Sequence, residues 1–311
     1  MKAFCFFLLT TTFLSLSAQV KEKCERILKP QIKSSLSCRK CHEEEYKAWE
    51  GSRHKDSFSN SLFQRGYKQE KDARCLTCHI PMLEQQDLFF SGDTNNLLLQ
   101  EGVNCQSCHA PALNNVPLLK ESIFCARCHQ FKFRNSNEYA QKTFDEWKEY
   151  KNSGGTKTCQ KCHMPEGIHS FEGIYTVSQS RTSLNIAIVQ KNGDNTKLSI
   201  ENKTAGHHIP TGDVYRHITI EVTESGSSDF KVIAFIGRNP FWKSTATGQS
   251  LVFKNNNALK SGEIRFYDLP VKTKAVRVVY HFEANWAGKS YWKGEHLEKK
   301  IIFDSVISDS K

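Results

Sequence analysis

The sequence predicts two domains: a domain of helices and loops, followed by an all-β domain built as an antiparallel sandwich of the immunoglobulin-like kind. Ten of the 12 cysteines fall in short repeated frames between positions 38 and 162, in a region whose helix-like pieces are separated by loops. From about residue 172 cysteine is absent, and apolar residues alternate with polar ones as in strands. Only 38% of the 311 residues are hydrophobic, so either much of the chain is disordered or its core is partly built from something other than side chains.

The first residues have the pattern of a secretory signal peptide. Lys2 precedes a short apolar run over 4–16, and small residues near position 18 offer a cleavage site. We therefore expect residues 1–18 to be removed, residues 19–37 to form a charged lead, and the mature protein to be periplasmic or secreted. No later stretch approaches the roughly 20 apolar residues of a transmembrane helix. No membrane-spanning segment is expected after signal removal, and an uncleaved N-terminal anchor is the alternative.

Five copies of one motif predict the chemistry of the first domain. Each reads Cys-x-x-Cys-His, the attachment sequence of c-type haem, in which two thiols form thioethers with the haem and the histidine becomes the proximal iron ligand. Zinc sites and disulfides also use cysteine pairs, but neither requires a histidine directly after every pair. The sequence therefore predicts five covalent haems c. The cysteines are Cys38 and Cys41, Cys75 and Cys78, Cys105 and Cys108, Cys125 and Cys128, and Cys159 and Cys162, and the proximal histidines are His42, His79, His109, His129 and His163.

The haem-bearing domain is predicted to span residues 38–171. Successive motifs start 37, 30, 20 and 34 residues apart (75 − 38, 105 − 75, 125 − 105 and 159 − 125), so no gap leaves room for a large haem-free fold. The short interval between the third and fourth motifs predicts that their haems are neighbours. The net charge of +10 fits this interpretation, because dispersed lysines and arginines offset the two propionates of each haem. The basic residues form no run, so no nucleic-acid partner is expected.

Residues 172–311 are predicted to form the β-domain. Turn signals at Asn192-Gly193 and Ser225-Gly226 separate short runs of β-forming residues. This spacing predicts a sandwich of about seven strands, with a barrel as the alternative. The runs lie at 184–188, 198–200, 218–222, 232–236, 264–266 and 276–280.

Seven histidines outside the motifs are candidates for the distal axial position of a haem iron. Bis-histidine ligation gives a low-spin centre suited to electron transfer, whereas an open distal position allows small-molecule chemistry. The candidates are His54, His169, His207, His208, His217, His281 and His296.

Local sequence ranks these candidates. An acidic first turn begins a helix after the first motif, and continuing that helix would place His54 about 18 Å beyond His42, too far for both to bind one iron. If His54 is a ligand, it serves a different haem. His169 follows a turn containing Pro and Gly after the last motif, and His207 and His208 lie in a rigid turn between strands, from which a ligand can project. The others are explained as well by packing or solvation: His217, His281 and His296.

Several segments of the chain carry a resemblance to a known family. They are Cys38–His42 followed by Tyr46, Trp49, Ser52 and His54; Glu101-Gly102-Val103 before the third motif; Thr143-Phe144 with Glu146-Trp147 before the last motif; and the turn from Gly206-His207 to Pro210-Thr211-Gly212. These segments resemble the multihaem cytochrome c superfamily of the cytochrome c552 and c554 type, over most of residues 38–215. The resemblance implies distal-ligand roles for His54, His169 and His207.

The resemblance also bears on function. Related pentahaem nitrite reductases usually carry a lysine in place of the proximal histidine of the catalytic haem, whereas every motif here ends in histidine, and no catalytic residue is predicted. We therefore expect an electron carrier whose redox partner proteins the sequence does not identify. The alternative is an oxidoreductase of a small nitrogen or sulfur oxide at a five-coordinate haem. The β-domain is a candidate for docking to a membrane-associated or extracellular redox complex.

Overall fold

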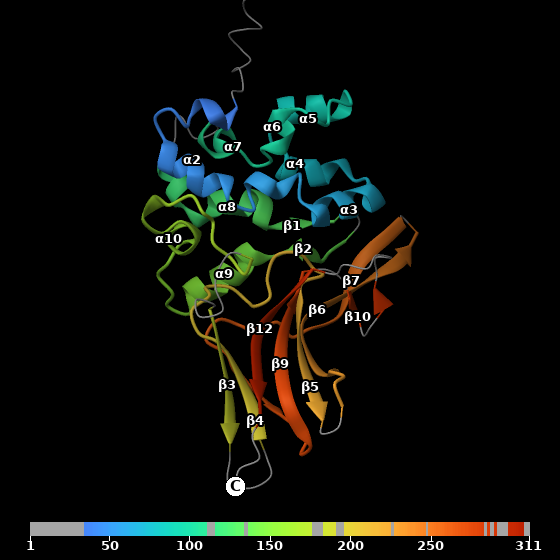
Figure 1. Cartoon of the computed structure of the whole chain (residues 1–311). Coiled ribbons are helices and arrows are strands. Elements are labelled where there is room, and N and C mark those ends of the chain that lie inside the picture. The colour runs from blue at the N-terminus through green and yellow to red at the C-terminus, as the bar shows by residue number, and fades with distance from the viewer. Residues whose placement is uncertain are drawn as a thin grey trace, which may run out of the picture.

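The computed structural model has a helical N-terminal part followed by antiparallel sheets (Figure 1). The predicted order, helices first and antiparallel strands second, is therefore confirmed. The predicted signal peptide, the lead up to residue 33 and His296 lie outside the described residues, and the immunoglobulin-like arrangement stays a prediction. No helix among the described residues has both the length and the apolar character needed to cross a membrane. The structure describes residues 34–110, 116–133, 136–175, 183–190, 196–224, 227–246, 248–282, 285–286, 289–290 and 298–307.

The N-terminal part consists of short helices, and four of the five motifs form the end of one. The helices α4, α7, α8 and α10 each end at the histidine of a motif, so the motif residues share one local geometry. Helices of four to eight residues are not stable alone in water, so tertiary contacts must hold them. The elements are η1 Ser35–Ser37, α2 Glu43–Glu50, η2 Lys55–Ser57, α3 Ser61–Glu70, η3 Ala73–Cys75, α4 Leu76–His79, α5 Leu83–Phe90, α6 Leu97–Gln100, α7 Cys105–His109, η4 Val116–Lys120, α8 Ser122–His129, β1 Phe131–Lys132, β2 Tyr139–Gln141, α9 Thr143–Asn152, α10 Cys159–His163 and η5 Pro165–Gly167.

The first helix is shorter than expected. The three glutamates of its first turn interact favourably with the helix dipole, but α2 ends at Glu50, with Gly51 as its C-cap. His54 follows in a separate turn that leads into η2. The expectation that one helix continues to His54 is therefore wrong, because the chain turns at Gly51 before it reaches the histidine.

The C-terminal part contains two antiparallel sheets that share one apolar core. The five-stranded sheet has the order β12-β9-β5-β6-β7, and the three-stranded sheet has the order β3-β4-β8. Side chains from both sheets meet in the core, including Ile200 of β4, Ile220 of β5 and Val278 of β9. All six predicted runs lie in strands. The strands are β3 Leu184–Gln190, β4 Thr196–Asn202, β5 His217–Glu224, β6 Lys231–Thr245, β7 Gly248–Asn256, β8 Ile264–Asp268, β9 Thr273–His281 and β12 Lys299–Val306, with a small separate pair, β10 Asn285–Trp286 and β11 Lys289–Ser290.

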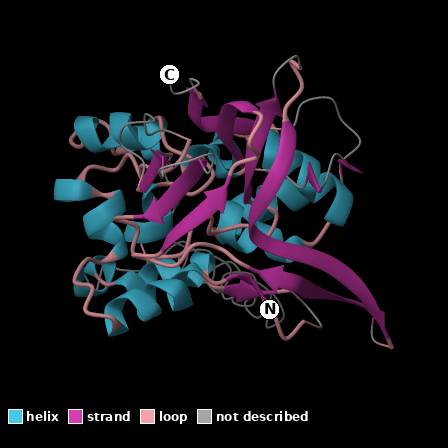
Figure 2. Ribbon diagram, turned by 90° about the horizontal axis from the view of Figure 1, so that it is seen from below, coloured by secondary structure: helices cyan, strands magenta, loops and turns pink. Residues whose placement is uncertain are grey.

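The hairpin of β6 and β7 joins the two parts of the molecule. It is the long pair of strands that extends from the body in Figure 2. Leu251 of this hairpin packs with Ala140 of β2, and the ring centroid of Trp242 lies 5.3 Å from that of Phe133. The guanidinium of Arg238 donates a 2.9 Å hydrogen bond to the Ala140 carbonyl. The N-terminal part itself has a much smaller apolar cluster than the sheets.

Candidate haem-binding sites

Three motif histidines each face a second histidine across a gap of about 6 Å. The ring centroids are 6.3 Å apart for His54 and His129, 6.1 Å for His109 and His169, and 6.2 Å for His163 and His207. A metal–imidazole bond is about 2 Å long, and the ligating nitrogen lies about 1 Å from the ring centre, so two axial imidazoles on one metal have centroids about 6 Å apart. Each gap therefore fits one iron.

The pair formed by the fifth motif and the turn before β5 has the most complete geometry. The planes of His163 and His207 are within 6° of parallel. Nδ1 of His163 lies 2.6 Å from the Glu172 carbonyl, and Nδ1 of His207 lies 2.8 Å from the His208 carbonyl. A carbonyl oxygen only accepts, so each Nδ1 carries the proton and each Nε2 keeps its lone pair for a metal. Burial also lowers the pKa of His207 to about 4, which keeps the ring neutral.

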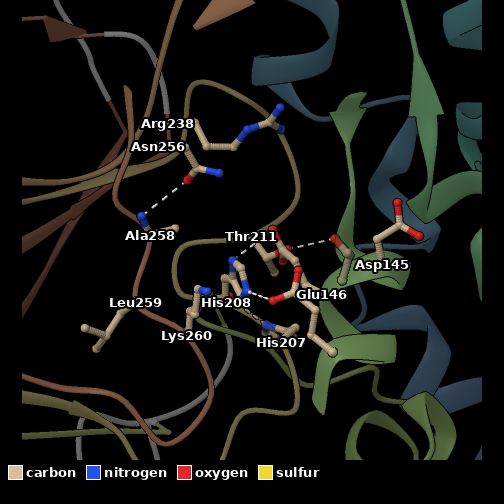
Figure 3. Close-up of polar contacts among 12 residues, drawn as sticks. Asp145, Glu146, His207, His208, Thr211, Arg238, Asn256, Ala258, Leu259 and Lys260 are labelled. Carbon is tan, nitrogen blue, oxygen red and sulfur yellow. Dashed lines mark hydrogen bonds and ion pairs between the residues drawn. The ribbon is translucent and has the colours of Figure 1, made fainter. Parts of the chain in front are cut away.

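Side chains of α9 hold the turn that carries His207 (Figure 3). The Thr211 hydroxyl donates a 2.6 Å hydrogen bond to the carboxylate of Glu146, which is only 2% exposed. Nε2 of His208 lies 3.0 Å from the Glu149 carboxylate. Because both partners lie on one helix, the turn is fixed against the N-terminal part on two sides. The C-terminal part thereby brings a histidine to a motif of the N-terminal part.

The segment before the third motif positions His54. The Val103 N–H donates a 3.0 Å hydrogen bond to the His54 carbonyl, and the Val103 carbonyl accepts one of 2.9 Å from Trp49 Nε1. Gly102 has φ +54°, and a Cβ there would lie 2.8 Å from the His54 carbonyl oxygen and 2.3 Å from Ser57 Oγ. Only glycine combines this φ with so close an approach.

Replacing Gly102 by alanine is expected to displace His54 and to destabilise the protein by more than about 2 kcal/mol, because positive φ alone costs about 1–2 kcal/mol and the new methyl group also overlaps backbone atoms. Gly92 is a matched control: its φ is +86°, but a Cβ there meets nothing within 4 Å. Chemical denaturation of both variants checks the prediction. Equal destabilisation of Gly102→Ala and Gly92→Ala would show that the close approach does not matter.

His129 and His54 both have pKa values far below the ordinary value for histidine. Burial, followed by the charge of His163, lowers the pKa of His129 to about 4. Burial lowers the pKa of His54 to about 3. Both rings are therefore neutral near pH 7, the form that ligates a metal.

The remaining two motif histidines face no described histidine in this way. His42 is largely exposed, with Nδ1 4.0 Å from a Glu45 carboxylate oxygen. Nδ1 of His79 lies 2.6 Å from the Ser57 carbonyl, which leaves Nε2 free for a metal, and its ring stacks on Phe63 at 3.8 Å. These two sites differ from the other three in the described part of the chain.

The other described distal candidates are engaged elsewhere. His217 and His281 stack on each other at 4.4 Å, where β5 and β9 pair. His208 points to the carboxylates of α9 instead of a motif histidine. None of the three fills the distal position opposite His42 or His79.

Thiol contacts indicate which motifs are neighbours. The Cys38 thiol hydrogen-bonds that of Cys105, so the first and third motifs are adjacent. The fourth motif touches two others through separate cysteines. Its contacts are Cys128 with Cys78 of the second motif, and Cys125 with Cys159 of the fifth motif.

The third and fourth motifs are linked through their facing histidines. The ring centroid of Phe171 lies 4.2 Å from that of His54 and 6.1 Å from that of His169. One aromatic side chain thus touches a histidine that faces His129 and a histidine that faces His109. The sequence marks both histidines as distal candidates but gives no sign of this phenylalanine, because its position depends on the turn after η5.

The comparisons with known proteins agree with these features. Residues 37–110 match the family model described as cytochrome c554 and c-prime. A penta-heme cytochrome c552 from Thermochromatium tepidum has a similar structure, with a TM-score of 0.63 and 18% sequence identity over 88% of this chain and 99% of that chain. At this identity the likeness shows a shared fold. A comparison with curated protein sequences finds no match.

Proposed function

We infer that this chain is a multihaem cytochrome c, and we propose that it is an exported protein that transfers electrons through five covalent haems c. The proposal rests on the five motifs and on the three facing histidine pairs, above all His163 with His207. Bound haem supplies an iron that changes its oxidation state by one electron. The chain contributes thiols for attachment, neutral imidazoles for ligation, and carbonyls that orient those imidazoles.

The facing pairs favour electron transfer over catalysis at three of the haems. Two histidines on one iron leave no position for a substrate, and such centres are low-spin. The Nδ1 hydrogen bonds of His163 and His207 fix both rings before and after a change of charge. A site that does not rearrange suits rapid electron exchange.

The contacts between motifs favour a branched path. The first motif neighbours the third, the third is connected to the fourth through Phe171, and the fourth neighbours both the second and the fifth. We propose that electrons pass through the haems in this spatial order, which differs from the order along the sequence. The haem of the fourth motif is then the junction, and those of the first, second and fifth motifs are the ends.

A second candidate function is reduction or oxidation of a small molecule at an open iron. His42 and His79 face no described histidine, so an open position belongs at one of these two haems. His79 is the better candidate, because burial lowers its pKa and its Nδ1 is already bound to a carbonyl. The two functions differ in spin state, because an open haem is high-spin and binds added ligands.

We further propose that residues 38–171 form the haem domain, and that residues 172–311 form an immunoglobulin-like β-domain. The β-domain has a direct part in haem binding under this proposal, because His207 belongs to it. Docking to a redox complex would be an additional role. Export to the periplasm would provide the compartment in which haem c is attached.

Intact-mass spectrometry of the protein from a host that matures c-type cytochromes tests the proposal. The mass is expected to exceed that of the polypeptide from residue 19 by five haems, and EPR is expected to show at least three low-spin haems. High-spin iron that binds added cyanide would favour the second candidate. A colourless product with the mass of the bare chain would refute both.

A further inference from the structure

Arg216 directly precedes β5 and lies within electrostatic range of His129 and His207, one histidine from each of two facing pairs. Its Nη1 donates a 3.5 Å hydrogen bond to the Thr211 carbonyl. Gly212 has φ +87°, and a Cβ there would lie 2.9 Å from Nη1, so the guanidinium rests against the backbone of the turn. The side chain is therefore held in one place near both haem sites.

This arginine has no carboxylate partner within ion-pair distance among the described residues, unlike others in the β-domain. Arg277 lies 2.6 Å from a Glu221 carboxylate oxygen, and Arg265 lies 2.6 Å from Glu263. Arg216 instead hydrogen-bonds the Tyr280 hydroxyl. The Asp213 carboxylate acts on Arg216 through electrostatics, but it forms no ion pair with it. The guanidinium therefore lacks direct contact with a carboxylate, the contact that best offsets removal of a cation from water.

A second cation and two hydroxyls complete the cluster. The Arg53 guanidinium lies 3.9 Å from the centre of the Tyr175 ring, and Tyr175 is also within electrostatic range of Arg216 and Tyr280. An arginine only donates, so the Tyr280 oxygen accepts from Arg216 and the phenol proton remains available for an acceptor. Two cations and two phenols in one place match the geometry of carboxylate recognition.

We propose that Arg216 and Arg53, with the hydroxyls of Tyr175 and Tyr280, bind the propionate carboxylates of the haem attached to the fourth motif. The inference deepens the proposed function and rests on it. The fourth motif is favoured because Arg53 directly precedes His54, the histidine that faces His129. The propionates would supply the direct carboxylate contact that Arg216 lacks, and the cations would hold them ionised.

The redox potentials of the holoprotein test this assignment. A nearby cation disfavours ferric iron, so Arg216→Gln is expected to lower the potential of one haem. A tenfold change in its reduction equilibrium, about 59 mV for one electron, is expected in a spectroelectrochemical titration. Arg216→Lys, which keeps the charge, is expected to recover most of the shift. Arg53→Gln should move the same haem in the same direction by less.

Arg277→Gln is the matched control, because it removes an arginine from the same sheet. Arg277 pairs with Glu221, four residues along β5 from His217, or about 13 Å further from Arg216. The control is expected to leave all potentials unchanged. Unchanged potentials in both Arg216→Gln and Arg53→Gln, at full haem content, would overturn the proposal. If the Arg216→Gln protein does not incorporate haem, the assignment is tested with Arg53→Gln and with a crystal structure of the wild-type holoprotein. Propionates more than 4 Å from both guanidiniums in that structure would refute the assignment. Absence of porphyrin in the wild type would refute the proposed function instead.

Discussion

Replacing His207 by alanine is expected to convert one haem per chain from low spin to high spin. The His207 ring faces His163 at 6.2 Å, and its Nδ1 hydrogen bond points Nε2 toward the gap. Alanine cannot ligate iron, so the haem of the fifth motif would keep one axial histidine. EPR and optical spectra should gain one high-spin signal relative to the wild type. Added imidazole should abolish it, because free imidazole can occupy the open position.

His208→Gln is the matched control for this experiment. His208 is adjacent in sequence, but its Nε2 lies 3.0 Å from the Glu149 carboxylate. The control is expected to show no new high-spin iron, even if the turn is weakened. A His207→Ala protein whose spectra match those of the wild type at full haem content would exclude His207 as a ligand. The role of the β-domain in haem binding would then have no support.

The motif chemistry can be proposed from the sequence alone because haem attachment is a local property. Two thiols and a histidine within five residues suffice for it, whatever the rest of the chain does. The pairing of distal histidines is not local. The chain turns at Gly51 and thereby brings His54 to the fourth motif. The turn at Pro210 lies against the fifth motif because Glu146 and Glu149 bind its side chains. No spacing in the sequence encodes these contacts.

The strands were predictable where one face is buried and the other is not. Alternation of side chains in β4, β5 and β9 gives this signal directly. The long hairpin was not predicted: Pro240 lacks an N–H and Gly237 weakens a strand pattern. The structure accommodates the proline with a register shift between Arg238 and Pro240. Packing of the hairpin against the N-terminal part, which the local sequence does not reveal, stabilises it there.

Acid is expected to destabilise the β-domain through His281. This side chain is 5% exposed, and its Nε2 lies 2.8 Å from the Thr219 hydroxyl, whose own proton is donated to Glu221. The Thr219 oxygen therefore accepts from Nε2–H, and the ring is neutral. Protonation would add a proton at Nδ1, which is buried and has no hydrogen-bond partner among the described residues. The folded protein thus resists protonation of His281.

The pKa of His281 is lowered to about 3, first by burial and then by His217, Lys299 and Arg277. The nearest carboxylate, Glu221, is 4.0 Å away and already paired with Arg277, so it offsets little of this effect. The unfolded chain binds the proton near the ordinary pKa of 6.5. Below that pH the unfolded state holds more protons, so the free energy of unfolding decreases as pH falls.

The expected loss is about 1.4 kcal/mol per pH unit below 6.5, or about 2 kcal/mol at pH 5, with no contribution from His281 above pH 6.5. Hydrogen exchange of β5 and β9 peptides, corrected for intrinsic exchange rates, measures it without depending on haem absorbance. In His281→Gln the pH slope should decrease by this amount, because glutamine does not titrate. The argument depends on the difference in slope and not on overall stability, which the substitution also changes. Parallel pH profiles for the two proteins would mean that His281 is protonated as easily in the folded chain as in the unfolded one.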